Sequence, residues 1–143
     1  MRVTQLSIFI ENKEGRIAEV TSILAGVNVN IRAISLADTS DFGVLRMIVN
    51  DSGKAAAALK KEGFTVGETD VVAVKVEDRP GGLHQILKII ESSGLNVEYM
   101  YSLGRTIDDS AVMIFRFDKI DQAIDVLTKE KLPVISKERV VGA

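Results

Sequence analysis

Two short segments of the sequence combine residue types that could hold a small molecule carrying both a carboxylate and an ammonium group. Residues 11–17 read ENKEGRI and residues 77–83 read EDRPGGL. In each segment a glycine follows three residues after Asn12 or Asp78, and a helix is predicted to begin at once. The first N–H groups of a helix lack intrahelical partners and carry partial positive charge, so they favour a carboxylate. The side-chain oxygen of Asn12 or Asp78 can accept hydrogen bonds from an ammonium group.

Two later asparagines extend this pattern. Asn30 and Asn96 lie 18 residues after Asn12 and Asp78, respectively. We expect each to open the second strand of its half, close to the turn, where an amide offers a donor and an acceptor to a zwitterion. A structural alternative stays open, in which Asn12 and Asp78 only cap their helices and the later asparagines only shape a turn.

The two segments belong to an internal repeat. An offset of 66 residues aligns about thirty positions without a gap and matches Gly15 with Gly81 and Asn30 with Asn96. The offset then grows to 68, which places an insertion near residues 104–109, where a hairpin turn is expected. An insertion at a turn, with a constant register in the apolar stretches, is typical of a duplicated fold.

Each half contains the same order of elements. Alternating apolar residues predict a strand, and apolar residues three and four apart predict a helix. For the first half we predict strands at 4–11, 29–37, 43–49 and 64–68, helices at 16–27 and 54–62, and a hairpin turn at 38–41. For the second half we predict strands at 70–77, 95–103, 110–117 and 134–139, and helices at 82–93 and 118–131.

The helix ends carry signals of their own. Asn28 and Gly94 follow the first helix of each half, and both residue types tolerate the left-handed conformation that ends a helix. Asp51 or Ser52 can cap the second helix of the first half, which is expected to end at Gly63.

The order strand, helix, strand, strand, helix, strand, taken twice, predicts an α+β fold of two tandem ferredoxin-like βαββαβ domains. Each domain would have a four-stranded antiparallel sheet with both helices on one face. We place the domains at residues 1–69 and 70–143.

One face of each predicted sheet is left without helices, because the strands alternate rather than being apolar throughout. We expect Phe9, Met47, Tyr99 and Tyr101 on these uncovered faces. A half of this size is only marginally stable alone. We therefore expect the halves to pack together and the chain to form a homodimer.

The composition limits the classes of function. With 46% hydrophobic and 27% charged residues, the chain is a globular protein. Lys plus Arg is 18 and Asp plus Glu is 20, so the basic surplus of a nucleic-acid-binding protein is missing. No apolar run reaches the roughly 18 residues of a membrane span, and the first residues do not resemble a cleaved leader. We expect a cytoplasmic protein with no nucleic-acid or membrane partner.

The sequence offers little for catalysis or metal binding. It has no cysteine and one histidine, His84, which rules out thiolate chemistry and a multi-histidine zinc site within one chain. We expect His84 to face solvent, Asp108 and Asp109 to form a turn, and Asp118 to cap a helix rather than bind a hard metal. Because no nucleophile with its base and no positioned acid is evident, we predict no enzyme and no cofactor.

The second half closely resembles the ACT domain. The resemblance is carried by residues 78–83 (DRPGGL) and 94–97 (GLNV), and it extends over nearly the whole chain as two tandem copies. The first half departs from the family pattern at Glu14, where the family often has Pro, and at Asn28, where it has Gly. The resemblance implies a non-catalytic regulatory module that binds a free amino acid between paired domains.

The resemblance also implies which residues contact the ligand. In the first half these are Asn12, Gly15, Arg16 and Ile17, with Asn30 opposite; in the second half they are Asp78, Gly81, Gly82 and Leu83, with Asn96. We favour the second site, because a carboxylate on Asp78 strengthens the contact with an ammonium group. An alternative function stays open: a regulatory subunit that binds and controls a separate biosynthetic enzyme, as the small subunit of acetolactate synthase does.

Overall fold

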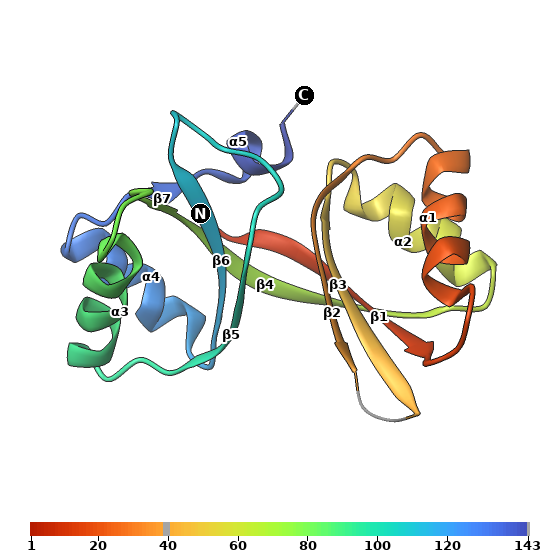
Figure 1. Cartoon of the computed structure of the whole chain (residues 1–143), viewed down its shortest axis with the longest axis horizontal. Helices are drawn as coiled ribbons and strands as arrows, with labels where there is room; N and C mark the ends of the chain where they lie inside the picture. Colours follow the sequence, from red (N-terminus) through yellow and green to blue (C-terminus); the bar gives the residue numbers. More distant parts are fainter. Residues whose placement is uncertain (39–40, 143) are drawn as a thin grey trace. The chain divides into compact units, whose positions relative to one another are not determined.

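The computed structural model describes residues 1–38 and 41–142 of the chain. Figure 1 shows the elements in their order along the sequence. They are β1 (Val3–Glu11), α1 (Arg16–Gly26), β2 (Ile31–Asp38), β3 (Phe42–Val49), α2 (Ser52–Lys61), β4 (Thr65–Val76), α3 (Gly82–Ser92), β5 (Val97–Ser102), β6 (Ala111–Phe117), α4 (Ile120–Lys129), β7 (Val134–Ile135) and α5 (Lys137–Val141).

The chain divides into two compact units. The N-terminal unit contains Thr4–Thr69 and the last few residues, and the C-terminal unit contains Met1–Val3 and Asp70–Val140. The strand β4 runs through the boundary as one continuous strand, where the sequence predicted two strands at 64–68 and 70–77.

Each unit has the strand order of a ferredoxin-like fold. The order is β2-β3-β1-β4 in the N-terminal unit and β7-β4-β6-β5 in the C-terminal unit. The pairs β1–β3, β2–β3, β4–β6, β4–β7 and β5–β6 are antiparallel. Helices α1 and α2 accompany the first sheet and α3 and α4 the second (Figure 1). The predicted fold of two tandem ferredoxin-like domains is confirmed.

The core of the N-terminal unit forms because alternate residues of β1 meet the apolar stripe of α1. Leu6 and Ile8 are fully buried and pack in one cluster with Val20 and Leu24 of α1. Met47 pairs with Leu6 across the strands and is fully buried in the same cluster. The prediction that Met47 lies on the uncovered face is therefore wrong, because the register of β3 turns its odd-numbered residues toward the helices.

The C-terminal unit repeats this packing, with larger side chains on β6 than on β3. Phe115 and Phe117 of β6 are fully buried, with stacked rings whose centroids lie 5.7 Å apart. Ile86 and Ile90 of α3 and Leu127 of α4 belong to the same cluster. Burial of these residues provides most of the stabilisation of a unit of this size.

Most predicted helix ends are confirmed. Asn28, Gly63 and Gly94 have φ values of 58°, 90° and 73°, which is the left-handed conformation. Asp51 caps α2 by accepting a hydrogen bond from the main-chain N–H of Lys54 at 3.1 Å. The hairpin predicted at 38–41 includes residues 39 and 40, which lie outside the described residues.

Two predictions in the second half are wrong. Helix α4 begins at Ile120 with Lys119 as its N-cap residue, so Asp118 is not the cap. The strand predicted at 134–139 ends at Ile135 and gives way to the short helix α5. Ser136 starts this helix. Its hydroxyl accepts a hydrogen bond from the N–H of Arg139 at 3.4 Å, and its main-chain carbonyl accepts one from the N–H of Val140 at 3.1 Å.

Candidate functional site

The two strand-to-helix turns share the conformation of their N-cap glycine and a main-chain hydrogen bond before it. Gly15 and Gly81 occupy the N-cap positions of α1 and α3, each with φ of 84°. The N–H of residue 13 or 79 donates to the carbonyl of Glu11 or Glu77 at 2.9 Å in both turns. Because this φ favours glycine, the repeat preserves a conformation that few other residues adopt without strain.

The first turn of each helix presents main-chain N–H groups. The N–H group of residue 16 donates to the carbonyl of residue 13, and the N–H group of residue 19 donates to that of residue 15. The equivalent residues 82 and 85 donate in the same way to the carbonyls of residues 79 and 81. The N–H groups between them, at 17–18 and 83–84, have no partner within the helix by its geometry. The capping alternative does not describe these helices, because their N-cap residues are glycines without a side chain.

Asn12 and Asp78 lie at the exposed start of these turns. The main-chain N–H of Asn12 donates to the carbonyl of Asp41 at 2.9 Å, which anchors the turn beside the start of β3. Ile17 is 40% exposed, although it belongs to the first turn of α1. These residues and the helix N-terminus therefore form one accessible surface in each unit.

Asn30 lies at the other end of the sheet from Asn12, so the prediction that it starts close to the turn is wrong. Asn50 donates its main-chain N–H to the carbonyl of Asn30 at 3.1 Å, and Asn50 follows the last residue of β3. The first residue of β3, Phe42, pairs with Glu11 beside the turn. At ~3.3 Å per residue, the length of β3 separates the two asparagines by roughly 23 Å.

The C-terminal unit shows the same separation. Asp118 donates its main-chain N–H to the carbonyl of Asn96 at 3.4 Å, at the end of β6. The start of β6 lies beside the end of β4, which leads into Asp78. The prediction overlooked that the helix after the first strand carries the chain back along the sheet, so the second strand starts at the end opposite the turn.

An arginine ties the strand end to the helix in both units, and we call this contact the arginine bridge. In the N-terminal unit Arg16 donates to Glu11 at 3.2 Å and to Glu19 at 2.8 Å. The hydrogen bond from Arg16 holds the pKa of Glu11 below its ordinary value, with Lys13 adding to the effect. The guanidinium of Arg16 also lies over the ring of Phe64, 5.4 Å from its centroid.

The C-terminal unit builds the arginine bridge from a different position. Arg79 donates to Glu77 and, at 3.4 Å, to Gln85. Glu77 and Gln85 are the repeat equivalents of Glu11 and Glu19, whereas Arg79 is the equivalent of Lys13. Sequence reasoning missed this contact, although aligning the charged residues of the repeat would have indicated it.

Each unit also has a hollow beside its turn. The N-terminal hollow, of about 270 Å³, is lined by Phe9, Ile10, Glu11, Arg16, Phe42, Gly63, Phe64 and Thr65. The C-terminal hollow, of about 180 Å³, is lined by Lys75, Glu77, Gly82, Gln85, Ile86, Ile89, Leu132 and Pro133. Five of these positions are repeat equivalents, so the fold places a hollow at the same point in each unit.

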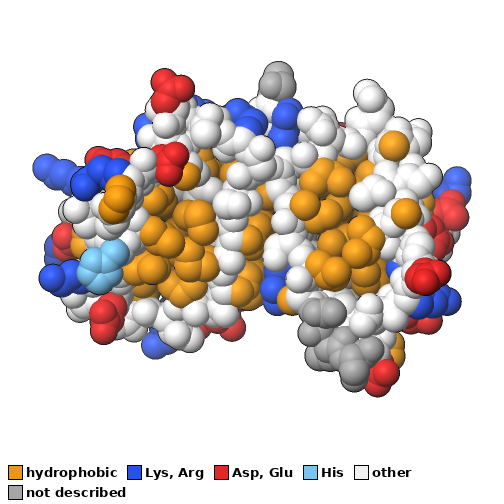
Figure 2. Space-filling model, in the orientation of Figure 1, with side chains coloured by type: hydrophobic (Ala, Val, Ile, Leu, Met, Phe, Trp, Pro, Cys, Tyr) orange, Lys and Arg blue, Asp and Glu red, His pale blue; other side chains and the backbone are white. Residues whose placement is uncertain are grey.

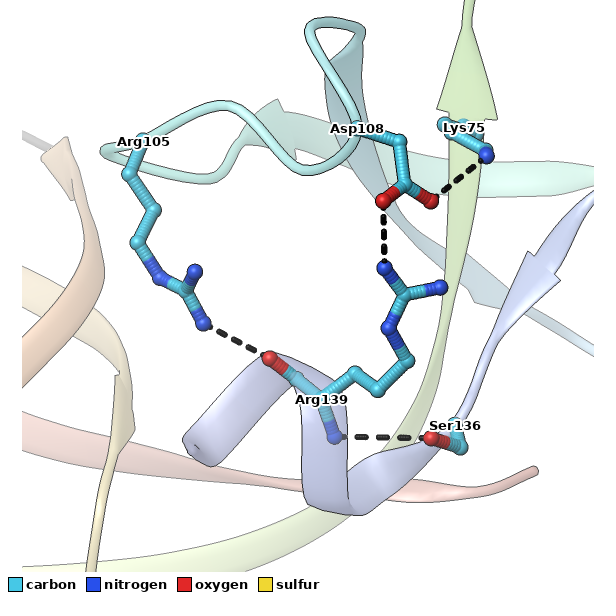
Figure 3. A network of polar contacts seen from close by, with 5 residues as sticks. All are labelled: Lys75, Arg105, Asp108, Ser136 and Arg139. Carbon is cyan, nitrogen blue, oxygen red and sulfur yellow. Dashed lines mark hydrogen bonds and ion pairs between the residues drawn. The ribbon is translucent and has the colours of Figure 1, made fainter. Parts of the chain in front are cut away.

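Figure 3 shows a polar network that holds α5 to the β5–β6 hairpin. Asp108 accepts from Arg139 at 2.8 Å and from Lys75 at 2.9 Å, and these contacts hold the pKa of Asp108 below its ordinary value. Arg105 donates to the main-chain carbonyl of Arg139 at 2.6 Å. Asp108 and Asp109 have φ of 52° and 59°, so both are turn residues as predicted.

Other candidate sites receive no support. His84 is exposed, as predicted, and is visible on the surface in Figure 2. Among residues 1–38 and 41–142, no group of three or more His, Cys, Asp or Glu side chains is arranged to hold a metal ion. Within the same residues, no helix has the length and apolar character needed to cross a membrane.

Comparison with known proteins agrees with this geometry. A family model described as an ACT domain pair matches residues 1–142. The chain is 39% identical to protein BT0572 from Bacteroides thetaiotaomicron, whose crystal structure has a TM-score of 0.93, with 100% of this chain and 98% of that chain covered. The comparison with curated proteins finds no match.

More distant structures share the fold. The ligand-free regulatory subunit of aspartate kinase from Thermus thermophilus is 18% identical, with a TM-score of 0.60, and 88% of this chain and 91% of that chain are covered. The corresponding subunit from Thermus flavus is 15% identical, with a TM-score of 0.59 and coverages of 88% and 90%. From the family match over nearly its full length, the chain belongs to the ACT domain family, as an ACT domain pair.

Proposed function

We propose that this protein is a non-catalytic regulator of amino-acid metabolism that binds a free amino acid at its strand-to-helix turns. ACT domains are regulatory modules that typically bind amino acids. The observation that carries the proposal is the left-handed glycine that both turns place at the start of the helix. The ligand carboxylate would lie against the N–H groups of residues 17–18 or 83–84, and its ammonium group against Asn12 or Asp78.

The separation of Asn12 from Asn30 supports a homodimer. An amino acid held at the turn cannot also reach Asn30 of the same unit, because the length of β3 lies between them. The same holds for Asp78 and Asn96. If the later asparagines contact the ligand, they must come from a neighbouring domain, and we propose that a second copy of the chain supplies them. Sedimentation at micromolar concentration should then give twice the mass of one chain.

A binding screen tests the ligand. Isothermal calorimetry with each of the twenty amino acids should identify those that bind, and for a ligand in the C-terminal unit Asp78→Ala or Asn96→Ala should weaken binding by about 1.5–3 kcal/mol. Asn12→Ala and Asn30→Ala test the N-terminal unit in the same way. Asp125→Ala, an exposed acid on α4, is the matched control and should leave binding unchanged. Unchanged binding in all four variants would mean that the turns are not the site.

A second candidate function is control of a separate biosynthetic enzyme by direct contact, in the cytoplasm. One protein that shares the fold is described as the regulatory subunit of an enzyme, aspartate kinase. Affinity capture from cell lysate, with and without the amino acid identified by calorimetry, separates the candidates. A captured enzyme whose activity changes with that amino acid would support this second function. A protein that binds its ligand without capturing an enzyme would act as a free sensor.

A further inference from the structure

We infer that the N-terminal hollow receives the side chain of the ligand and that this side chain is aromatic. The inference rests on the proposed function, because it names the class of amino acid that would bind at the turn of the N-terminal unit. It concerns a surface formed by Phe9, Phe42 and Phe64, together with Arg16 and Glu11.

Three aromatic rings line the N-terminal hollow, and two of them lie outside the hydrophobic core. Phe9 and Phe42 are 53% and 65% exposed, whereas Phe64 is 9% exposed and packs against the core. Phe9 and Phe42 lie near each other on adjacent strands, since Phe9 pairs with Val44 and Phe42 with Glu11. Large exposed apolar side chains gathered at one hollow are typical of a binding surface. Aromatic side chains favour an aromatic ligand, because an offset-stacked or edge-to-face pair of rings is more stable than burial of the same apolar area alone would make it.

The polar groups of the hollow fit the other end of an amino acid. Arg16 uses its two terminal nitrogens for Glu19 and Glu11, and its Nε is buried without a hydrogen-bond partner in the described part of the chain. The guanidinium of Arg16 adds positive charge beside the N–H groups of residues 17–18, where the ligand carboxylate is proposed to lie, and Glu11 adds negative charge beside Asn12, on the side of the ammonium group.

The repeat shows that aromatic walls are not a requirement of the fold. At the equivalent places the C-terminal unit has Lys75 instead of Phe9, Leu132 instead of Phe64, and Ser110 instead of Phe42. Lys75 is paired with Asp108, and the C-terminal unit forms its smaller hollow without an aromatic ring. The rings of the N-terminal hollow therefore distinguish one unit from the other, and an aromatic ligand would bind only the N-terminal unit.

Calorimetry with L-phenylalanine, L-tyrosine, L-leucine and L-alanine tests this on the full chain. The aromatic amino acids should bind tighter than leucine, and alanine should bind weakest. Phe42→Ser and Phe9→Lys, which install the residues of the C-terminal unit, should each weaken phenylalanine binding about tenfold while changing alanine binding little. Both residues are more than half exposed, so the variants are expected to fold.

Ile34→Ser is the matched control, because Ile34 is 45% exposed on β2 and does not line the hollow. It should leave phenylalanine binding unchanged. If some amino acid binds but phenylalanine has no advantage over alanine, or if Phe42→Ser has no effect, the inference fails and the proposed function stands. If no amino acid binds at all, both fail. If Phe42→Ser lowers the sedimentation mass without altering binding, a second copy covers the hollow and the inference is overturned.

Discussion

Gly82 lies so close to the main-chain carbonyl of Glu77 that a Cβ at residue 82 would overlap the carbonyl oxygen. The turn of the C-terminal unit thus folds back onto the end of its own strand. In the N-terminal unit Arg16 holds the equivalent position with a full side chain. The two turns therefore share the conformation of their N-cap glycines but not this contact.

Gly82→Ala should destabilise the C-terminal unit by about 1–3 kcal/mol, because the main chain at Glu77 must move to admit the methyl group. Urea unfolding followed by circular dichroism measures the loss. Gly26→Ala is the control, because Gly26 ends α1 and nothing lies within 4 Å of a Cβ placed there. It should be neutral or stabilise by up to about 1 kcal/mol, since alanine favours a helix. Equal effects of the two changes would contradict the close contact at Gly82.

Gly15→Ala should cost about 1–2 kcal/mol for a different reason. A Cβ at Gly15 meets nothing within 4 Å, so the loss would arise from the left-handed backbone alone. Gly15→Asn should therefore cost clearly less than Gly15→Ala, because asparagine tolerates this conformation, as Asn28 does at the other end of α1. Thermal unfolding of the three proteins gives the order. Asparagine as costly as alanine would show that something other than φ is responsible.

Asp108→Asn should lower stability near neutral pH and lose its effect in acid. Hydrogen bonds from Arg139 and then Lys75 hold the pKa of Asp108 below its ordinary value in the folded chain. A carboxyl group with a lowered pKa stabilises the fold above its unfolded pKa, ordinarily about 3.9, and this contribution is lost as the pH falls through the folded value.

Melting temperatures of the parent and Asp108→Asn should therefore differ at pH 7 and converge once the pH falls below the pKa that Asp108 has in the folded chain. The difference should also shrink in salt, because the pair is half exposed. Asp109→Asn, at the next position of the same turn, is the control and should leave the melting temperature at pH 7 close to that of the parent. A difference that persists in acid would mean that Asp108 acts through the turn and not through its charge.

The second helices of the two units differ in their caps. Asp51 accepts from the N–H of Lys54, whereas Lys119, the repeat equivalent of Asp51, makes no side-chain cap. Asp51→Ala should cost about 0.5–2 kcal/mol, and Lys119→Asp should stabilise by a similar amount, because the backbone angles of the two positions are alike. Urea unfolding measures both. Loss of stability in Lys119→Asp would show that Lys119 has a role beyond the helix start.

Much of the fold follows from local patterns in the sequence. The periodicity of β1 and α1 and the residues at Asn28 and Asp51 act within a few positions, so the elements and their ends could be predicted. The prediction of a strand at 134–139 was wrong for an equally local reason. Ser136 can start a helix, but the apolar residues around it favoured a strand in the sequence pattern. Met47 was misplaced because its face depends on the register of β3.

The site is less accessible from sequence, because it is assembled by pairing. The turns were found because their residues are adjacent in the chain. Asn30 lies far from Asn12 because α1 carries the chain back along the sheet before β2 begins, which is a consequence of the βαββαβ order. Phe42 reaches the hollow because β3 pairs with β1, and Phe64 because β4 begins beside them. Because Phe42 and Phe64 are distant in the sequence, no motif indicates that they line the same hollow. Aligning the two halves of the repeat shows only that these positions differ between the units.

The arginine bridge records how the two halves diverged after duplication. Arg16 and Arg79 occupy positions three residues apart in the repeat, yet each joins the acid at the strand end to the first turn of the helix. Natural selection can therefore retain an interaction while the residue that supplies it changes place. A position-by-position comparison would count the bridge as lost in one copy.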